Sequence, residues 1–340
     1  MSTRKKILYI GNKLAIHGKS PTSVDLLSGW FQNENLDVVS SSSQTNKVFR
    51  LGDMIRTFFE QKDVVDLVLI DTYSTQNFYY AVVIAKLCRI YGVPYFPVLH
   101  GGDLPLRLKK NSRMSKSLFA NAKMNVSPSM YMKHQFTRSG IENVIYIPNT
   151  IDLSKYPFKL RKSIKTKLLW VRSFAEIYNP LLALEVVEIL LKKGLDVELC
   201  MVGPEKDGSL QNCKKVAAEL NLPITFTGIL KKEEWIDLSK KYDIFINTTN
   251  FDNMPVSVME AMALGLPVIS TNVGGLPFLI DSGKDGVLIE PNNAQMFVDE
   301  ILALCSNPAK TEIISKNARS KMEKFDWEVV KHKWIKLFDF

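Results

Sequence analysis

The sequence predicts an α/β protein of two domains, each built on a parallel β-sheet. Short runs of β-branched and apolar residues alternate along the 340 residues with amphipathic segments of helical length. This alternation is typical of repeated strand–helix units. The runs fall into two sets of six, and residues 148–164 between them show little periodicity. With 46% hydrophobic and 23% charged residues, the chain has the composition and the length of a two-domain globular protein.

The expected strands follow the apolar runs. In the first half they are residues 6–10, 37–39, 64–70, 95–99, 123–126 and 144–147, and in the second half 167–171, 197–202, 224–227, 244–247, 268–270 and 287–289. We therefore expect a first domain over residues 1–150, a linker over 151–164 and a second domain over 165–322. Within residues 323–340, the stretch from Trp327 to Phe338 has the pattern of an aromatic-rich amphipathic helix.

Basic residues are concentrated in the first half of the chain. Residues 1–150 contain 19 Lys and Arg against 10 Asp and Glu, whereas residues 151–340 contain 25 of each, so the whole net charge of +9 belongs to the first half. Such an excess favours an anionic partner. Six basic residues lie among apolar ones from Leu104 to Lys123. This segment fits an anionic membrane surface and, equally, a solvated helix face. Nucleic-acid binding is less favoured because no recognition motif accompanies the charge.

Several classes of protein are disfavoured by what the sequence lacks. The four cysteines are far apart and have no metal-ligand spacing, which fits reduced thiols. No run of 18 apolar residues occurs, and the apolar run after the basic start is too short for a signal peptide. We therefore expect a cytoplasmic protein whose membrane contact, if any, is peripheral on the inner face. A nicotinamide oxidoreductase is disfavoured because no Gly-x-Gly-x-x-Gly follows the first expected strand.

Small or polar residues follow the expected strands of the first half, where open parallel sheets bind their ligands. Gly11 and Asn12 follow the first strand and lead to Gly18 and Lys19. They fit an acceptor site, and a plain strand-to-helix turn equally well. His100 follows strand 95–99 beside two glycines. Its imidazole can donate to a sugar hydroxyl or a phosphate oxygen, or it can be a capping or core histidine.

The second half contains an anion-attracting corner. Arg172 ends strand 167–171 and can bind phosphate bidentately, with a structural ion pair as the alternative. Asn179 and Pro180 have the pattern of a helix cap and first helical residue, which adds backbone donors. Four further residues follow strands and would lie beside a bound nucleotide: Asn149, Gly203, Gly228 and Ile229.

The most informative stretch, residues 251–277, places Asp252 and Glu260 eight positions apart around a helix start. Pro255 fits the first helical position and Gly265 the end. The free backbone N–H groups at this start suit a diphosphate, and they lie near Asn253, Met254, Pro255 and Val256.

Glu260 lies beyond the first helical turn among apolar neighbours, so we expect it to be buried and to need partners. Two adjacent ribose hydroxyls would satisfy both of its oxygens. Asp252, in the preceding loop, could accept hydrogen bonds from the donor sugar. The alternative is an ordinary helix cap followed by a surface glutamate.

Taken together, these residues resemble the retaining glycosyltransferases of family four, over nearly the whole chain. The likeness is strongest over residues 252–277, with an acidic residue, seven positions, a Glu, then Ala-Met-Ala-x-Gly-x-Pro-Val-Ile and Gly-Gly-x-Pro. Pro-Asn-Thr-Ile-Asp at 148–152 and Phe-Asp-Trp at 325–327 support it. The resemblance implies the GT-B fold, in which two Rossmann-like domains face each other across a cleft and a C-terminal helix crosses back to the first domain.

The resemblance also implies roles for single residues. Glu260 would hold the ribose diol, Asp252 the donor sugar, Arg172 the diphosphate and His100 the sugar or its phosphate, while Gly274 and Gly275 would keep room near them. Three departures stand out. The family usually has Glu in place of Asp252. Its phosphate-binding Lys falls near Tyr178 or Asn179, with Lys206 or Lys231 as substitutes, and its third acidic residue is Phe278.

The expected activity is transfer of a sugar from a nucleotide-sugar donor to a glycan or lipid-linked acceptor, with retention of anomeric configuration, in cell-surface polysaccharide assembly. No Asp-x-Asp motif occurs, so no metal or cofactor is expected, and Arg172 with helix N-termini would stabilise the leaving diphosphate. Two alternatives use the same nucleotide site: a GT-B sugar-nucleotide epimerase, and a non-catalytic sugar-nucleotide-binding protein or partner subunit. The missing Lys favours the non-catalytic protein.

Overall fold

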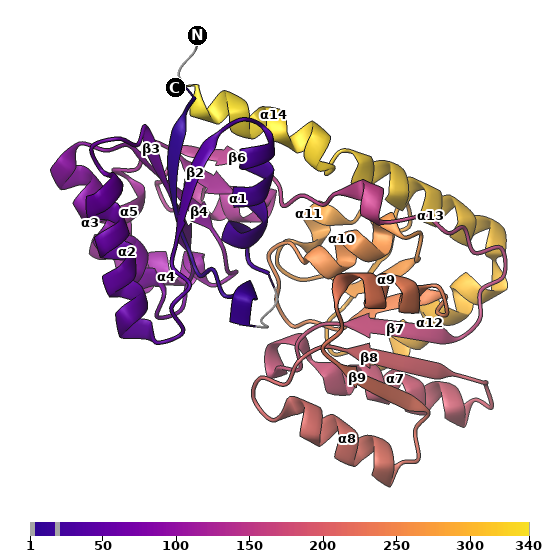
Figure 1. Cartoon of the computed structure of the whole chain (residues 1–340). Helices are drawn as coiled ribbons and strands as arrows, with labels where there is room; N and C mark the ends of the chain where they lie inside the picture. The colour runs from indigo at the N-terminus through magenta and orange to yellow at the C-terminus, as the bar shows by residue number, and fades with distance from the viewer. Residues whose placement is uncertain (1–3, 18–20, 340) are drawn as a thin grey trace. The chain divides into compact units, whose positions relative to one another are not determined.

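The structure is a computed structural model that describes residues 4–17 and 21–339. The chain forms two compact units. The first extends to Pro148 and includes the last residues from Lys336 onward, and the second is Asn149–Ile335. Residues 151–164, expected as a linker, group with the second unit. Figure 1 shows the elements of each unit coloured along the chain.

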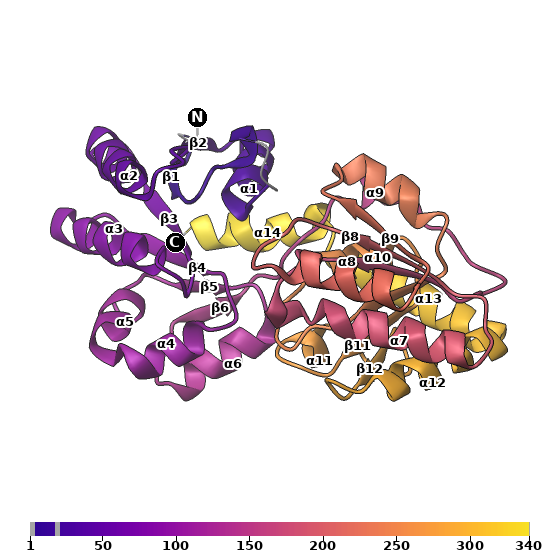
Figure 2. The same cartoon turned by 90° about the horizontal axis from the view of Figure 1, so that it is seen from below.

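The first unit contains a six-stranded parallel sheet in the order β2-β1-β3-β4-β5-β6. Its strands are β1 Lys6–Ile10, β2 Asp37–Ser41, β3 Leu67–Thr72, β4 Tyr95–Leu99, β5 Asn125–Ser127 and β6 Val144–Tyr146. Its helices are α1 Ser23–Asn33, α2 Lys47–Gln61, α3 Phe78–Tyr91, α4 Leu104–Lys110, α5 Ser112–Phe119 and α6 Met130–Arg138, with a short 3-10 helix at Ala15–His17. Figure 2 shows α2 and α3 on one face of this sheet and α1 on the other.

The second unit contains another six-stranded parallel sheet, in the order β12-β11-β10-β7-β8-β9. Its strands are β7 Lys167–Val171, β8 Glu198–Val202, β9 Ile224–Gly228, β10 Ile244–Asn247, β11 Val268–Thr271 and β12 Val287–Ile289. Its helices are α7 Pro180–Lys192, α8 Ser209–Glu219, α9 Lys232–Ser239, α10 Val256–Ala263, α11 Leu276–Leu279, α12 Ala294–Ser306, α13 Pro308–Glu323 and α14 Trp327–Phe338, with 3-10 helices at Leu153–Lys155 and Glu176–Tyr178. One core lies under α7, α8 and α12, and a second lies under α9, α10 and α13.

Helices cover both faces of each sheet, so most strands are buried and appear in the sequence as continuous apolar runs, whereas the edge strand β9 is partly exposed. All twelve expected strands are present, and residues 6–10, 95–99, 167–171, 244–247 and 287–289 have the predicted bounds. The prediction for β3 was wrong at both ends. Val64 and Val65 instead donate backbone hydrogen bonds to Gln61 in the turn that ends α2, so the strand begins later and extends to Asp71 and Thr72.

Of two expected helix starts, one is shifted by a residue, and the other is found at Pro180 as expected but without the side-chain cap. Pro255 is the N-cap of α10, with an extended backbone (φ −71°, ψ 118°), so the helix begins at Val256. Asn179 precedes α7 in a left-handed conformation (φ 45°), without a capping hydrogen bond from its side chain. Its Nδ2 instead donates to Asn292 Oδ1 at 2.8 Å.

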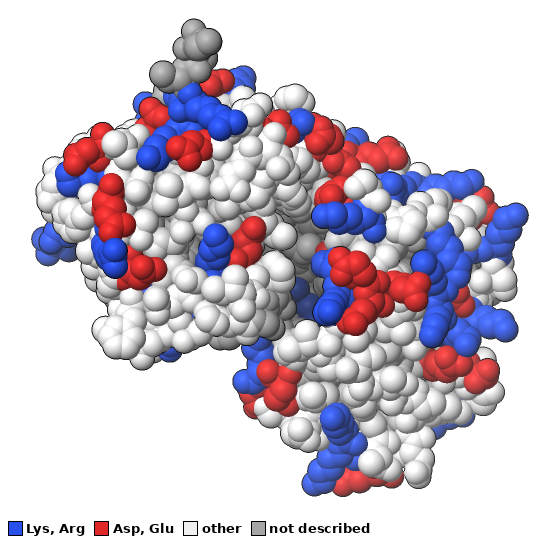
Figure 3. All heavy atoms as spheres, viewed as in Figure 1, with Lys and Arg blue, Asp and Glu red and all other residues white. Residues whose placement is uncertain are grey.

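The basic segment from Leu104 to Lys123 forms two short helices, α4 and α5, because the backbone at Asn111 (φ −119°, ψ 51°) interrupts the helical path. Leu106 is 54% exposed and Met114 38% exposed, so apolar side chains stand among the basic ones at the surface. On the face seen in Figure 3, the charges of the first unit are mixed in sign. Within the described residues, no helix has the length and apolar character needed to cross a membrane.

The end of α14 belongs to the first unit. Phe338 packs edge-to-face on Phe31 of α1, with ring centroids 5.3 Å apart and an interplanar angle of 79°. Aromatic pairs favour this arrangement. The amphipathic pattern predicted for this helix is confirmed.

Candidate functional site

The second unit places Arg172 and Asp252 together beyond the carboxyl end of β7. Arg172 Nη2 forms an ion pair with Asp252 Oδ2, and the two side chains are 17% and 12% exposed. The Arg172 guanidinium lies 4.3 Å from the centroid of the Tyr178 ring. Burial lowers the pKa of Arg172, and the nearby Tyr178 opposes that shift. Among the described residues, Arg172 Nε has no hydrogen-bond partner, so this buried cation keeps a donor for a ligand.

The loop that carries Asp252 is held by close backbone contact with residues 274–275. The Gly275 N–H donates to the Asp252 carbonyl at 2.9 Å. A Cβ at Gly274 would lie 2.0 Å from the Asp252 carbonyl oxygen, and one at Gly275 would lie 1.6 Å from that of Asn253. These glycines are therefore required for loop packing within the chain. The family resemblance had implied another reason for glycine at these two positions, namely room for the ligand.

Gly203 follows β8 and lies beside Gly228, the last residue of β9. The Gly203 N–H donates to the Gly228 carbonyl at 2.9 Å. A Cβ at Gly203, where φ is 148°, would lie 1.8 Å from the Arg172 carbonyl oxygen, so this glycine lets Arg172 approach. At Gly228 a Cβ would meet nothing within 4 Å. The neighbouring Ile229 is 60% exposed and leaves an apolar surface open for a flat ring.

Gly275→Ala is expected to lower the free energy of unfolding by about 3 kcal/mol, because the new Cβ must displace backbone rather than a flexible side chain. Gly228→Ala is the matched control in the same unit. It adds strain at a positive φ of 72° but overlaps nothing, so the cost should be about 1 kcal/mol. Urea denaturation of both variants measures the difference. Equal destabilisation would show that the contact between residues 275 and 253 is not tight.

Glu260 is a buried carboxylate on α10. It is 3% exposed, and its neighbours from Val258 to Ala263 are buried. Its Oε1 accepts a hydrogen bond from Tyr156 Oη at 2.7 Å and another from Lys232 Nζ. Burial raises the pKa of Tyr156 well above its ordinary value, and the charge of Glu260 adds to the shift, so Tyr156 keeps its hydrogen and donates it. The expected burial of Glu260 is confirmed.

The two oxygens of Glu260 differ in their surroundings. Two donors already occupy Oε1, which has two lone pairs. Within the described part of the chain, Oε2 receives no hydrogen bond. Oε2 is therefore the oxygen that remains open to a further donor.

The first turn of α10 contains three further unpaired donors. The backbone N–H groups of Val256 and Ser257 donate to no described residue, as is usual in the first turn of a helix. Ser257 Oγ is also buried without a hydrogen-bond partner among the described residues. The preceding loop is fixed by Asn149, whose Nδ2 donates to the Met254 carbonyl at 3.0 Å. Asn149 thus contacts the chain and supports the helix start.

Two residues of this site carry no signal in the sequence: Tyr156 and Lys232. Tyr156 and Lys232 are 104 and 28 positions from Glu260, so no local pattern links them to it. Tyr178 stands where the family's Lys was expected, and its ring covers the Arg172 guanidinium instead. Lys206 and Lys231, considered as substitutes for that Lys, are exposed, and no hydrogen bond or ion pair joins either to Arg172 or Glu260 in the described structure.

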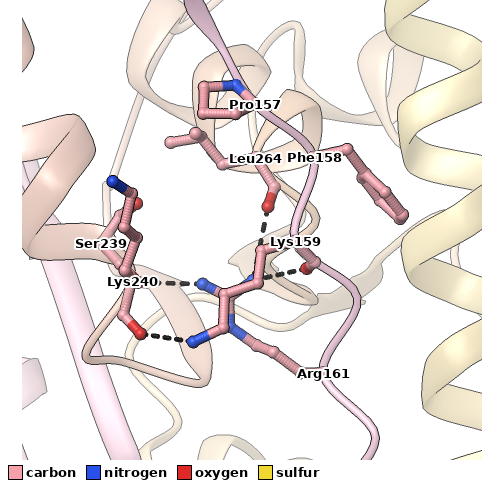
Figure 4. A pocket seen from close by; sticks show the side chains of 7 residues that line it. All are labelled: Pro157, Phe158, Lys159, Arg161, Ser239, Lys240 and Leu264. Atoms are coloured by element: carbon pink, nitrogen blue, oxygen red, sulfur yellow. Dashed lines mark hydrogen bonds between the residues drawn. The ribbon is translucent and has the colours of Figure 1, made fainter.

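A cavity of about 180 Å³ in the second unit is bordered by Arg161 (Figure 4). Arg161 is 4% exposed and donates to the carbonyls of Tyr242, Lys159, Leu264 and Ser239 at 2.7, 3.0, 3.3 and 2.9 Å. Burial lowers its pKa to about 10, and Asp243 opposes the shift. Since the chain takes four of its five N–H donors, Arg161 anchors residues 157–161.

In the first unit, Gly11 and Asn12 serve the fold. A Cβ at Gly11 would lie 2.5 Å from Asp71 Oδ2. Asn12 Oδ1 accepts from Arg50 Nη1 at 3.1 Å. Gly18 and Lys19, the other expected acceptor-side residues, lie outside the described residues. His100 follows β4 as expected, and its Nε2 lies 2.8 Å from Asp71 Oδ1.

Part of the chain is similar to known glycosyltransferases. Residues 154–321 match the family model described as Glycosyl transferases group 1. Sulfoquinovosyl transferase SQD2 of Arabidopsis thaliana is 30% identical over 149 residues, which are 43% of this chain and 28% of that protein. The UDP-Gal:alpha-D-GlcNAc-diphosphoundecaprenol alpha-1,3-galactosyltransferase of Escherichia coli is 27% identical over 191 residues, which are 52% of this chain and 48% of that protein. Each match thus spans less than half of the relative.

A solved structure is similar over nearly the whole chain. The crystal structure of HepE from Anabaena in complex with UDP has a TM-score of 0.78 and 16% identity, and the match covers 98% of this chain and 99% of that one. This likeness, with two six-stranded parallel sheets, shows the two-domain α/β GT-B fold. Arg172, Asp252 and Glu260 all lie within residues 154–321, the part of the chain that matches the Glycosyl transferases group 1 model.

Proposed function

We propose that this protein transfers a sugar from a nucleotide-sugar donor to a glycan or lipid-linked acceptor. The observation that carries the proposal is the buried Glu260, whose Oε2 is unpaired on the helix that also presents free donors in its first turn. The carboxylate of a side chain that is almost wholly buried needs donors, and a ribose hydroxyl supplies one. The UDP in the HepE structure and the UDP-sugar in the name of the E. coli relative support a uridine nucleotide as the first probe.

The diphosphate would lie at the start of α10. There the amides of Val256 and Ser257 and the Ser257 hydroxyl can donate to its oxygens, and the helix dipole favours its charge. Arg172 Nε adds a charge-assisted donor. Negative charge gathers on the leaving phosphate as the anomeric bond breaks, so these groups stabilise the transition state more than the ground state.

The Arg172–Asp252 pair links the phosphate site to the sugar site. A diphosphate competes with Asp252 for the guanidinium. Donor binding would thus free the Asp252 carboxylate to accept hydrogen bonds from sugar hydroxyls. The side-chain amide of Asn253 would border the sugar, and the exposed Ile229 would border the base. His100 would contribute a hydrogen bond to the sugar or its phosphate.

We further propose retention of anomeric configuration, with same-face attack by the acceptor hydroxyl and the departing phosphate oxygen taking its proton. Metal independence is supported by the lack of an Asp-x-Asp motif. Gly11, Asn12, Gly18 and Lys19 remain the proposed acceptor side. A role in cell-surface polysaccharide assembly, in the cytoplasm, is supported by the diphosphoundecaprenol acceptor in the name of the E. coli relative. Peripheral contact with the inner face of the membrane is supported by the basic residues and exposed Leu106 and Met114 of α4 and α5.

Thermal melting with a panel of UDP-, GDP- and ADP-sugars tests the donor class. A ligand that binds the folded state at 100 times its Kd adds about 2.7 kcal/mol of stability, so one member of the panel should raise the melting temperature clearly. That donor is then incubated with lipid-linked and glycan acceptors, and NMR of the product reports the anomeric configuration, with and without EDTA. An inverted product would exclude the proposed mechanism, and loss of turnover in EDTA would exclude metal independence.

A non-catalytic sugar-nucleotide-binding protein is the second candidate, and Tyr178 in place of the expected Lys favours it. Donor stabilisation without turnover on any acceptor would support this candidate. A GT-B epimerase would instead convert the donor alone into a second sugar nucleotide. Product analysis without acceptor separates the epimerase from the transferase.

A further inference from the structure

A buried polar cluster lies at the carboxyl-terminal edge of the first unit's sheet. β3 pairs with β1 on one side and with β4 on the other. Asp71 is near the end of β3, Tyr9 is in β1, and His100 follows β4. The backbone N–H of His100 donates to the Thr72 carbonyl at 2.8 Å. Three neighbouring strands thus bring an imidazole, a carboxylate and a phenol together.

The Asp71 carboxylate has two partners on the same oxygen. Oδ1 accepts from Tyr9 Oη at 2.8 Å and lies 2.8 Å from His100 Nε2. The Asp71 side chain is 0% exposed, and Oδ2 has no hydrogen-bond partner among the described residues. A buried carboxylate is stable only where donors satisfy it. Here the described donors are the phenol and the imidazole.

These contacts decide which imidazole nitrogen carries a hydrogen. Burial raises the pKa of Tyr9 well above its ordinary value, and the charge of Asp71 raises it further, so Tyr9 is a donor. An ionised carboxylate only accepts, so His100 Nε2 must also donate. A hydrogen on Nε2 leaves Nδ1 as the ring nitrogen for a ligand. Within the described part of the chain, Nδ1 has no hydrogen-bond partner.

The ring and the carboxylate are both held in place. Tyr73 stacks on the His100 ring with centroids 5.2 Å apart and planes 30° apart. Gly11 lies against Asp71 Oδ2 so closely that a Cβ there would come within 2.5 Å of it. The His100 side chain is nevertheless 12% exposed, so part of the ring is open at the edge of the sheet where ligands bind.

We propose that Asp71 is a positioning residue that holds His100 with its hydrogen on Nε2 and presents Nδ1 to a hydroxyl of the sugar. A hydroxyl both donates and accepts, so it can pair with Nδ1 in either charge state of the ring. The inference rests on the proposed transfer function for its substrate. Its structural half, the fixed tautomer, does not depend on that function.

Nitrogen-15 NMR of protein labelled at its four histidines tests the tautomer directly. His100 is assigned by comparison with His100→Gln, and the wild type is expected to carry its hydrogen on Nε2. Asp71→Ala should give a mixture of tautomers, whereas Asp71→Asn, which keeps an acceptor oxygen, should restore the Nε2–H form. Tyr9→Phe is the matched control, because it removes the other hydrogen bond to Oδ1 and leaves the acceptor for Nε2. A wild-type hydrogen on Nδ1 would overturn the proposal even if Asp71→Ala did not fold.

Turnover with the donor and acceptor found by the panel tests the role of the pair. Misplacement of a binding group can cost about 10²-fold in rate, so Asp71→Ala and His100→Ala are each expected to lose up to that factor. The double variant should lose no more than either single variant, because both changes remove the same contact. Additive losses, or full turnover of Asp71→Ala, would overturn the positioning role. No turnover by the wild type would refute the transfer function. The NMR result would then still decide whether Asp71 fixes the hydrogen of His100 on Nε2.

Discussion

Arg172→Ala is expected to lower turnover by about 10²- to 10³-fold, the usual cost of removing one group that stabilises developing charge. The guanidinium is mostly buried and keeps a free Nε donor, so it acts where water screens little. We expect a much smaller change in donor affinity, because the phosphate gains charge mainly as the anomeric bond breaks. Steady-state kinetics at saturating donor measures kcat, and calorimetry with UDP measures binding.

Two matched variants make the Arg172 result interpretable. Arg172→Lys keeps a positive charge and loses the planar fork, so its turnover should lie between those of the wild type and the alanine variant. Lys206→Ala removes an exposed basic residue of the same unit and should leave kcat unchanged. An unaltered kcat in Arg172→Ala would remove this residue from the phosphate site. Equal losses in kcat and in UDP affinity would indicate ground-state binding only.

Glu260→Gln is expected to weaken UDP binding by about 10- to 100-fold, because a hydrogen bond to a charged group contributes about 1.5–3 kcal/mol. The amide keeps the size of the side chain but loses the negative charge that pairs with Lys232 and that, in the proposed complex, would face the ribose. Calorimetry with UDP measures the change. Glu312→Gln, at a glutamate of the same unit paired with Lys316, should bind UDP as the wild type does.

The stability of Glu260→Gln must be followed as well, because the substitution also alters the bonds to Tyr156 and Lys232. Tyr156→Phe removes one of these bonds and leaves Oε2 in place. We expect it to lower the melting temperature and to retain most of the UDP affinity. If Tyr156→Phe weakened UDP binding as much as Glu260→Gln, the effect would come from the loss of packing around α10 and not from a ribose contact.

The sequence was sufficient for the existence of the twelve strands, for the bounds of five of them and for the burial of Glu260. Strands covered on both faces consist of apolar runs with sharp ends, as at residues 167–171 and 244–247, where the predicted bounds are those observed. Glu260 could be placed inside because its neighbours along the helix are apolar on every side. Both inferences use residues that are adjacent in sequence, where a pattern is visible.

The remaining features depend on contacts between distant positions. Lys232 and Tyr156 reach Glu260 from other elements, and Asp71 reaches His100 from 29 positions away. The ion pair between Arg172 and Asp252 joins two residues that the sequence suggested for separate parts of the donor. Gly275 likewise looked like a residue that makes room for a ligand, whereas its missing Cβ lets two loops of the chain touch. Such pairings follow from the tertiary fold and leave no periodic signal.

Calorimetry with UDP and 2′-deoxy-UDP, on the wild type and on Glu260→Gln, tests most directly whether Glu260 binds the ribose. 2′-Deoxy-UDP lacks the hydroxyl and Glu260→Gln lacks the charge of the same proposed hydrogen bond. The wild type should therefore bind UDP about tenfold or more tightly than 2′-deoxy-UDP. Glu260→Gln should bind both with nearly the same affinity. Equal discrimination by the two proteins, or no binding of UDP, GDP or ADP by the wild type, would contradict the account.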